Sequence, residues 1–271
     1  MPDTPRLRLA VLDWAGTTVD HGCFAPIAPF VETLKRLGLN ATVAEARGPM
    51  GLLKLDHLRK LFELDTVSAQ FKAKNGRAWT EEDVRTAYDT HFIPLQLGCV
   101  RDCSKLLPGV LATVAALRGQ GLKIATTTGY FAEAAQLAYA AAAEQGYKPD
   151  FNFNPGDVPA GRPAPWMVFR AMEATGVFPP HCVIKIGDTI PDIEEGRAAG
   201  VWSVGVISTG SEIGMSEEEW NSIAKPEQQR LMDVVGRKLR DIGAHFTIPS
   251  IADLPGLVAE IDRRLAAGER P

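Results

Sequence analysis

The sequence has no long run of apolar residues and little net charge. Its 271 residues include 29 Lys and Arg against 33 Asp and Glu, which gives a formal net charge of -4. No stretch approaches the roughly 18 apolar residues that a membrane-spanning helix needs, and no basic run suggests a nucleic-acid partner. The N-terminal apolar stretch is too short for a secretory signal. We therefore expect a cytoplasmic protein that binds neither membrane nor nucleic acid.

Cysteine is also scarce. The four cysteines are scattered, at Cys23, Cys99, Cys103 and Cys182. Cys99 and Cys103 have no second pair of ligands nearby, which argues against a zinc site. Reduced thiols are the default in the cytoplasm, so no disulfide framework is expected.

From about residue 104 onward, short apolar runs alternate with helical patterns, as in βαβ units with a parallel sheet. The apolar runs predict strands at 7–12, 122–126, 151–153, 183–186, 203–206 and 245–247. Helical patterns occupy 110–118, 131–145, 165–175, 192–200 and 254–265. The predicted fold class is therefore α/β, with a Rossmann-like parallel sheet.

Residues 22–103 differ from the rest because they show amphipathic helical patterns and no confident strand. The patterns predict helices at 27–37, 52–62 and 81–97. We therefore expect an all-α domain at 22–103, inserted into a core domain formed by 1–21 and 104–271. The charged helical stretch 212–240 is expected to be a surface excursion of the core.

Polar residues follow several of the predicted strands, at the edge where an open parallel sheet binds its ligands. Asp13 ends the first strand, and a hydroxyl run, Thr126–Thr128, ends the second. Arg162 precedes a predicted helix, and Asp188 and Asp192 follow a later strand. Carboxylates, a hydroxyl and a cation that converge in this way suit phosphoryl transfer to a carboxylate.

Each of these side chains has a predicted role. As the nucleophile, Asp13 must approach an anionic phosphoryl group, so a Mg²⁺ ion is expected, with Asp188 as a second carboxylate ligand. Asp192 is expected to hold a metal-bound water or to act from the second shell. Thr128 and Arg162 are expected to contact phosphoryl oxygens, although the sequence leaves Thr126 and Thr127 open as alternatives to Thr128.

The motif MGLLKLDHLRKLF predicts a helix on which Met50, Lys54 and His57 share one face. Amphipathic helices usually keep lysine in solvent. Spacing alone therefore does not single out Lys54 as a reactive amine over Lys35 or Lys60.

The segments DWAGTTVD, TTTGY, GRPAPW and GDTIPD resemble the four ordered motifs of the haloacid dehalogenase superfamily. Members of that superfamily use a strand-end Asp as nucleophile, and the helical insertion resembles their cap domain. The longer segments DWAGTTVDHGCFAP, ARGPMGLLKLDH, QGYKPDF, DVPAGRPAPWM and GAHFTI are similar to the phosphonatase family within it. The resemblance extends over nearly the whole chain, about residues 7–247.

The phosphonatase resemblance implies hydrolysis of the C–P bond of phosphonoacetaldehyde to acetaldehyde and phosphate, in the degradation of 2-aminoethylphosphonate. It makes Lys54 the Schiff-base residue and Asp13 the group that is phosphorylated. An imine accepts the electron pair that leaves phosphorus, so the leaving group needs no proton on oxygen. This explains why Ala15 stands where most phosphatases of the superfamily carry a second Asp, and its backbone carbonyl is still expected to bind Mg²⁺.

The resemblance also implies supporting roles and a homodimer formed through the caps. His57 is expected to relay protons during imine formation, although the sequence leaves open that it is a hydrogen-bonded polar residue at the boundary of cap and core. Substrate contacts are expected from Met50, Gly51, Tyr130 and Cys23, although the sequence leaves open that Tyr130 packs under the cap and that Cys23 is a hinge residue.

Two other functions compete with this prediction. One is a phosphatase or phosphomutase of the same superfamily that acts on a small phosphate ester. Ala15 argues against it because an ester leaving group would depart without its general acid. The other is a non-catalytic binding protein, against which the joint presence of Asp13, Thr128, Arg162 and Asp188 argues.

Overall fold

A six-stranded parallel sheet forms the centre of the protein. The computed structural model describes residues 5–271, so residues 1–4 of the predicted core domain lie outside the described residues. The strands are β1 (Leu9–Leu12), β2 (Lys123–Thr127), β3 (Phe151–Phe153), β4 (Val183–Gly187), β5 (Trp202–Val206) and β6 (Phe246–Ile248). Their order is β3-β2-β1-β4-β5-β6, and each neighbouring pair is parallel. The strand order switches direction between β1 and β4, where an open α/β sheet places its ligand crevice.

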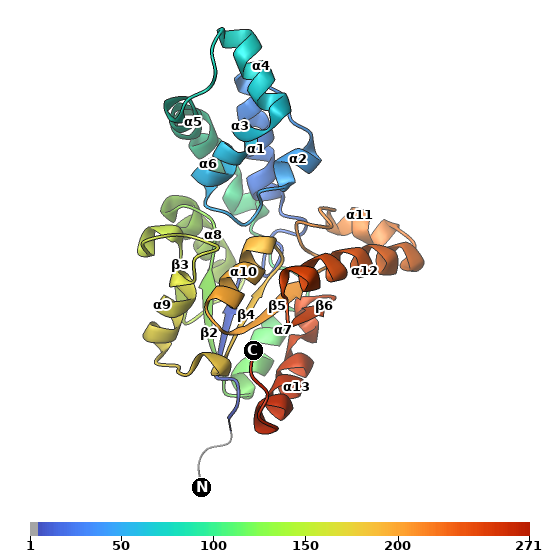
Figure 1. Cartoon of the computed structure of the whole chain (residues 1–271). Coiled ribbons are helices and arrows are strands. Elements are labelled where there is room, and N and C mark those ends of the chain that lie inside the picture. The colour runs from blue at the N-terminus through green and yellow to red at the C-terminus, as the bar shows by residue number, and fades with distance from the viewer. Residues whose placement is uncertain (1–4) are drawn as a thin grey trace.

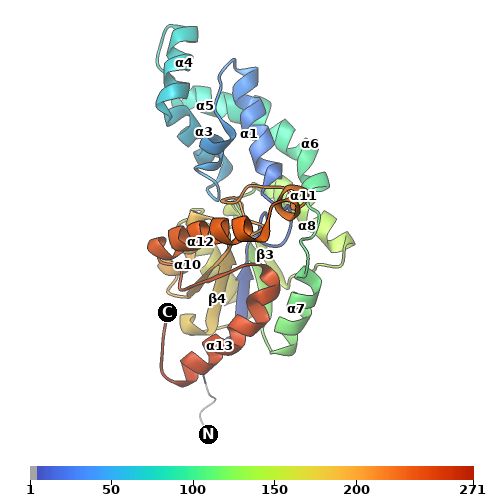
Figure 2. The same cartoon turned by 90° about the vertical axis from the view of Figure 1, so that its right-hand side faces the viewer.

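Helices cover both faces of this sheet (Figure 1, Figure 2). One face carries α7 (Val110–Gly119), α8 (Ala132–Glu144) and α13 (Leu254–Ala266). The other carries α9 (Trp166–Thr175), α10 (Ile190–Ala198) and α12 (Lys225–Ile242), with the short α11 (Glu217–Ser222) before α12. Because both faces are covered, β1 reads LAVL and all four of its residues are buried.

Six helices follow β1 and lie over the carboxyl ends of the strands (Figure 1). They are α1 (Phe24–Arg36), α2 (Val43–Arg47), α3 (Lys54–Glu63), α4 (Asp65–Asn75), α5 (Glu81–Ala87) and α6 (Ile93–Cys103). We refer to Phe24–Cys103 as the cap. The cap packs around its own apolar cluster, which includes Phe30, Leu34, Phe62 and Phe92. It also contacts the core, where α6 packs against α8.

Most predicted elements are present with small shifts of their ends. The predicted helix 81–97 is interrupted by a π-helical turn at Tyr88–Phe92 and continues to Cys103. Pro94 has no N–H to donate to the carbonyl one turn earlier, which favours a wider turn at this point. The short helices α2 and α4 were not predicted. Within residues 5–271, no helix is both long and apolar enough to cross a membrane.

The predicted helix 52–62 begins only at Lys54, so the prediction that Met50 shares its helical face is wrong. Gly51 has a φ of +93°, a left-handed conformation that glycine adopts without strain and that interrupts a helix. Met50 therefore lies in a turn that precedes α3, while Lys54 and His57 lie on the buried side of the helix.

The prediction that 212–240 is only a surface excursion is also wrong, because α12 packs against α10 and β6. Val235 and Leu239 are buried in a cluster with Ile193 and Ile207. A side chain at Gly205 in β5 would lie 2.6 Å from Leu239, so the helix approaches the strand closely. The many charges of the segment lie on its outer face, which hid the buried stripe.

This packing predicts a large loss of stability from truncation of Leu239. We expect Leu239→Ala to lower the free energy of unfolding by about 2–5 kcal/mol, because it opens a cavity between helix and sheet. The matched control is Val234→Ala on the same helix, where the side chain is 46% exposed and the loss should stay below about 0.5 kcal/mol. Urea unfolding measures both, and equal small losses would contradict the packing of α12.

Candidate active site

Asp13 and Asp188 meet beyond the carboxyl ends of β1 and β4. The backbone N–H of Asp13 donates to the Ile186 carbonyl at 2.9 Å, which ties the end of β1 to β4. The chain then turns sharply through Gly16, whose φ is +82° and at which a Cβ atom would lie 2.6 Å from Asp188 Oδ2. Thr17 Oγ1 lies 3.3 Å from Asp188 Oδ1. The AGTT turn after Asp13 therefore folds directly against the second carboxylate.

These carboxylates form a group that could hold a metal ion. Oxygen atoms of Asp13, Asp188 and Asp192 lie within 4.8 Å of one another, and all three residues are buried. Hard cations such as Mg²⁺ prefer carboxylate and carbonyl oxygens of this kind. The sequence predicted that Asp13 and Asp188 meet at the strand ends, with Asp192 nearby on the helix that follows Asp188.

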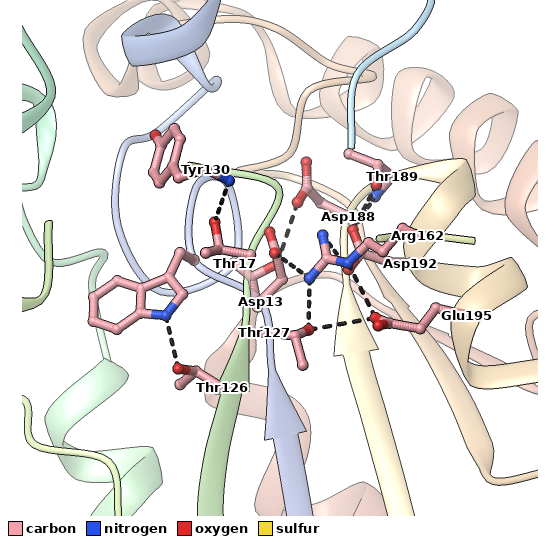
Figure 3. Close-up of polar contacts among 12 residues, drawn as sticks. Asp13, Thr17, Thr126, Thr127, Tyr130, Arg162, Asp188, Thr189, Asp192 and Glu195 are labelled. Carbon is pink, nitrogen blue, oxygen red and sulfur yellow. Dashed lines mark hydrogen bonds and ion pairs between the residues drawn. The ribbon is translucent and has the colours of Figure 1, made fainter. Parts of the chain in front are cut away.

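Arg162 lies at the centre of a buried network of charges (Figure 3). Its guanidinium makes four contacts: with Asp13 at 2.7 Å, Asp192 at 2.9 Å, Glu195 at 3.0 Å and Thr127 Oγ1 at 2.6 Å. A guanidinium presents its donors in a rigid planar fork, so these acceptors fix its orientation. Arg162 is held beside Asp13 before any substrate is bound.

Lys185 and Glu195 complete this network, and the sequence did not single them out. Lys185 Nζ pairs with Asp192 and lies 3.6 Å from Glu195. Both residues are almost fully buried. The available signals were a lysine within the apolar strand VIKIG and an acid three positions after Asp192, on the same face of α10.

The network separates the acids by their pKa values. Burial raises the pKa of Asp13, although Arg162 opposes the rise. Burial and the charge of Asp13 raise the pKa of Asp188 well above its usual value. Burial acts in the same direction on Asp192, but Arg162 and Lys185 outweigh it, so the pKa of Asp192 is lowered. Two neighbouring carboxylates that resist ionisation are the environment that a divalent cation relieves.

The three threonines at the end of β2 have different surroundings. Thr126 accepts a hydrogen bond from Trp14 Nε1 at 2.8 Å, and Thr127 accepts one from Arg162. Thr128 Oγ1 accepts one from the backbone N–H of Tyr130 at 3.1 Å, and Thr128 lines a small cavity beside Asp13. Of the three, Thr128 is the one that a ligand in that cavity would meet.

This cavity lies between cap and core, and much of the predicted site surrounds it. Predicted residues that line it are Asp13, Ala15, Cys23, Met50, Gly51, Lys54, Thr128, Tyr130 and Arg162. The space open to the centre of a water molecule is only ≈ 20 Å³, which suits about one or two waters. Larger cavities of ≈ 400 and ≈ 530 Å³ lie elsewhere on the protein.

Lys54 is the cap residue with the most unusual environment. It is 3% exposed, and its Nζ lies 5.2 Å from the centroid of the Tyr130 ring. Burial lowers the pKa of Lys54 to about 8, against an opposing effect of Asp13. Lys35 and Lys60, which spacing left as alternatives, are exposed. A lysine that gives up its proton this readily is suited to act as a nucleophile.

The cap loop immediately before Lys54 contacts the core very closely. At Gly51, a Cβ atom would lie 2.2 Å from Thr189 Oγ1. At Gly129, a Cβ atom would lie 2.7 Å from the Leu52 carbonyl oxygen. Glycine at both positions permits this approach, so the site is closed in this structure.

His57 and Cys23 differ in their position relative to the cavity. His57 does not line the cavity: it stacks on Phe30 with ring centroids 3.7 Å apart, and its Nε2 lies 2.8 Å from the Ala46 carbonyl. Burial and the charge of Lys54 lower the pKa of His57 well below its usual value. Cys23 lies immediately before α1 with a φ of 57°, lines the cavity, and places its Sγ 3.4 Å from Asp188 Oδ2.

The fold agrees with the comparisons to known proteins. The family model of haloacid dehalogenase-like hydrolases matches residues 7–200, and the chain belongs to that family. A phosphonoacetaldehyde hydrolase of Bacillus cereus (strain B4264) is 40% identical over 259 residues, which cover 96% of this chain and 98% of that protein. Within the family, the chain therefore belongs to the phosphonoacetaldehyde hydrolases.

Two further similarities extend over almost the whole chain. A bifunctional phosphonoacetaldehyde hydrolase/aminoethylphosphonate transaminase of Clostridioides difficile (strain 630) is 42% identical over 257 residues. The match covers 95% of this chain but only 40% of that longer protein. A crystal structure of a phosphonoacetaldehyde hydrolase like protein from Oleispira antarctica superimposes with a TM-score of 0.96 at 38% identity, covering 99% of this chain and 97% of that one.

The buried network predicts that removal of one of its cations is costly. We expect Lys185→Met to lower the free energy of unfolding by about 3–5 kcal/mol, because Asp192 and Glu195 lose a compensating charge. In the control, Lys238→Met removes a half-exposed ion pair with Glu212 and should change stability by less than about 1 kcal/mol. Equal effects of the two substitutions in urea unfolding would contradict a coupled buried network.

Proposed function

We propose that this protein hydrolyses the C–P bond of phosphonoacetaldehyde, with Lys54 as the Schiff-base residue and Asp13 as the nucleophile. The observation that carries the proposal is the small cavity that buries Lys54 together with Asp13, while Ala15 stands two residues after the nucleophile. An amine with a lowered pKa suits attack on an aldehyde, and a carboxylate suits attack on phosphorus.

In the proposed reaction, the Lys54 amine adds to the aldehyde carbon, and loss of water forms an imine. Asp13 then bonds to phosphorus as the P–C bond breaks. The electron pair of that bond moves into the imine and produces an enamine, so no free carbanion forms. Water hydrolyses the aspartyl phosphate to phosphate. Protonation of the enamine carbon and hydrolysis of the imine release acetaldehyde and restore Lys54.

Arg162 and Thr128 support the transfer of the phosphoryl group. Because Arg162 is already oriented beside Asp13, it is available to bind a phosphoryl oxygen without reorganisation. The Thr128 hydroxyl accepts from the Tyr130 amide and so keeps its own hydrogen for a second phosphoryl oxygen. Met50, Gly51, Tyr130 and Cys23 are proposed to surround the substrate, and a proton relay through His57 stays a prediction.

The carboxylates also fit a Mg²⁺ ion. One oxygen of Asp13 accepts a hydrogen bond from Arg162, and its Oδ2 and the Ala15 carbonyl accept none from residues 5–271. We propose Asp13, Asp188 and the Ala15 carbonyl as ligands. Both oxygens of Asp192 are engaged, by Arg162 and Thr189, which favours a supporting role in the second shell. Mg²⁺ would neutralise the repulsion between Asp13 and the anionic substrate.

The proposed domain division follows from the same chemistry. Lys54 belongs to the helical domain 22–103, and Asp13 to the core formed by 1–21 and 104–271. A cavity of ≈ 20 Å³ is too small for the substrate, so the cap must open to admit it and close to expel water. A homodimer through the caps and a cytoplasmic location stay predictions.

The function is tested directly by incubating the protein and Mg²⁺ with phosphonoacetaldehyde and measuring acetaldehyde and phosphate. Borohydride added with the substrate should reduce the imine and leave an ethyl or phosphonoethyl group on Lys54, detected by mass spectrometry. A faster release of phosphate from a simple phosphate ester, without a Lys54 adduct, would favour the rival phosphatase.

Lys54→Arg is predicted to abolish the C–P cleavage while preserving the fold. The guanidinium stays protonated and forms no imine, so turnover should fall on the order of 1,000-fold or more. Lys60→Arg is the matched control, since Lys60 lies on the same helix with an exposed side chain, and it should retain activity. Full activity in Lys54→Arg would refute the role of the lysine.

The rate is predicted to depend on pH through Lys54. Its pKa is lowered to about 8, so the reactive free amine increases as pH rises through this value. We expect kcat/KM to rise with pH, to reach half its maximum near pH 8, and to level off above that value. Assays over a series of buffers measure this profile. A midpoint near the ordinary lysine value of 10.5 would show that Lys54 reacts from an exposed position.

A further inference from the structure

Arg47 joins the cap to the core through backbone carbonyls. It is the last residue of α2, and its guanidinium donates to the Gly22 carbonyl at 2.6 Å and to the Gly214 carbonyl at 3.1 Å. The Ser211 carbonyl lies 3.5 Å away, and the guanidinium also lies 5.2 Å from the Phe24 ring centroid. One side chain of the cap therefore reaches both the linker into the cap and a loop of the core.

The carbonyls that receive Arg47 belong to positions where only glycine fits. Gly214 has a φ of +65°, and a Cβ atom there would lie 2.8 Å from Arg47 Nε. Gly22 has a φ of +79°, and a Cβ atom there would lie 2.3 Å from the Met215 carbonyl oxygen. Glycine at 214 therefore permits the approach of the guanidinium, and glycine at 22 permits the approach of the linker to the loop that carries Gly214.

On the core side, the same loop contacts the proposed metal ligands. We call Ser208–Met215, which follows β5, the 208–215 loop. Its Ser211 amide donates to Asp188 Oδ2 at 2.7 Å, and its Thr209 hydroxyl donates to the Gly16 carbonyl at 2.6 Å. One end of this loop thus holds Asp188, and the other end holds Arg47.

On the cap side, Arg47 begins the segment that ends at Lys54. The Met50 amide donates to the Arg47 carbonyl at 3.0 Å, which makes a tight turn. Gly51 then packs on Thr189, and α3 starts at Lys54. Fixing Arg47 therefore fixes the start of the short segment that delivers Lys54 to the cavity.

We propose that Arg47 is a positioning residue that latches the cap closed, by binding carbonyls of the linker and of the 208–215 loop and thereby holding Lys54 against the site of Asp13. The proposal rests on the proposed function for its catalytic meaning, because closure matters when Lys54 and Asp13 must act on one substrate. The contact of Arg47 with the core stabilises the closed conformation whether or not that function is correct.

The chemistry of the latch suits a contact that must form and release in each cycle. Hydrogen bonds from a guanidinium to neutral carbonyls are weaker than a buried ion pair, and breaking them leaves no carboxylate without a partner. The charged head also returns to solvent on release. Closure is therefore favourable but reversible. Reversibility is needed because the closed cavity is too small for the substrate, so the cap must open to admit it.

The latch is tested by the accessibility of Lys54 without substrate. We expect Arg47→Gln to increase the rate at which an amine-reactive reagent modifies Lys54 by about 10-fold or more, because the closed state loses two or three charge-assisted hydrogen bonds. Peptide mass spectrometry measures this rate against that of the exposed Lys60. Arg47→Lys, which lacks the planar fork, should lie between the variant and the unmodified protein.

The matched control is Arg36→Gln, which removes a cap guanidinium that pairs, among residues 5–271, with Glu32 on its own helix. It should leave the labelling of Lys54 unchanged. Gly214→Ala is a second route to the same state, since its Cβ atom displaces the guanidinium while Arg47 is kept. Labelling at the unmodified rate in both Arg47→Gln and Gly214→Ala would overturn the latch.

Kinetics separate the latch from a merely structural role and from the proposed function. With phosphonoacetaldehyde, Arg47→Gln should lower kcat/KM by about 10-fold or more while thermal unfolding stays close to that of Arg36→Gln. Faster labelling with unchanged kcat/KM would overturn the positioning role. If the unmodified protein fails to turn over the substrate, the proposed function is refuted, whereas the labelling result still decides the latch.

Discussion

The active-site edge depends on one constraint: several charged side chains are buried together, and most of them are neutralised by charged neighbours. Arg162 does most of this work because its planar fork contacts Asp13, Asp192 and Glu195 at once. Lys185 adds the second cation from within β4. The network orients Arg162 beside Asp13 in advance, which is what stabilisation of a phosphoryl group requires.

Asp188 stands apart from this arrangement, because it has no cation within the network. Its carboxylate is held by the Ser211 amide and by Thr17, and burial beside Asp13 raises its pKa. A buried carboxylate that lies beside Asp13 without a cation of its own is unfavourable for the protein alone and favourable for a divalent cation. The same carboxylate also connects the core edge, through the 208–215 loop, to the contact that Arg47 makes from the cap.

The cap supplies what the core lacks. The carboxyl ends of the six core strands carry no lysine. Lys54, the first residue of α3 in the cap, lines the cavity instead. Glycines at 51 and 129 allow the two parts to approach within contact distance. Burial between cap and core lowers the pKa of Lys54. The contact that closes the cavity therefore also favours the neutral amine.

The sequence by itself determined the local features: the strand that ends in Asp13, the hydroxyl run at Thr128, the place of Asp188 and the alternation of strands and helices. These depend on apolar periodicity and on short-range turn chemistry, which are visible in neighbouring residues. Helical spacing could not rank Lys54 above Lys60, because both are lysines of one amphipathic helix. The resemblance to the phosphonatase family singled out Lys54, and burial distinguishes the two in the structure.

Tertiary structure alone decided which charges meet. Glu195 and Arg47 pair with groups from segments distant in the chain, whereas Lys185 pairs with acids of the next element, α10. The apolar stripe of α12 is buried, and the charges on its outer face masked it in the sequence. Met50 lies outside the helix that the sequence predicted for it, because Gly51 takes a left-handed conformation against Thr189. Periodicity reports which side of an element is apolar, whereas the neutralisation of a buried charge depends on what another element brings to it.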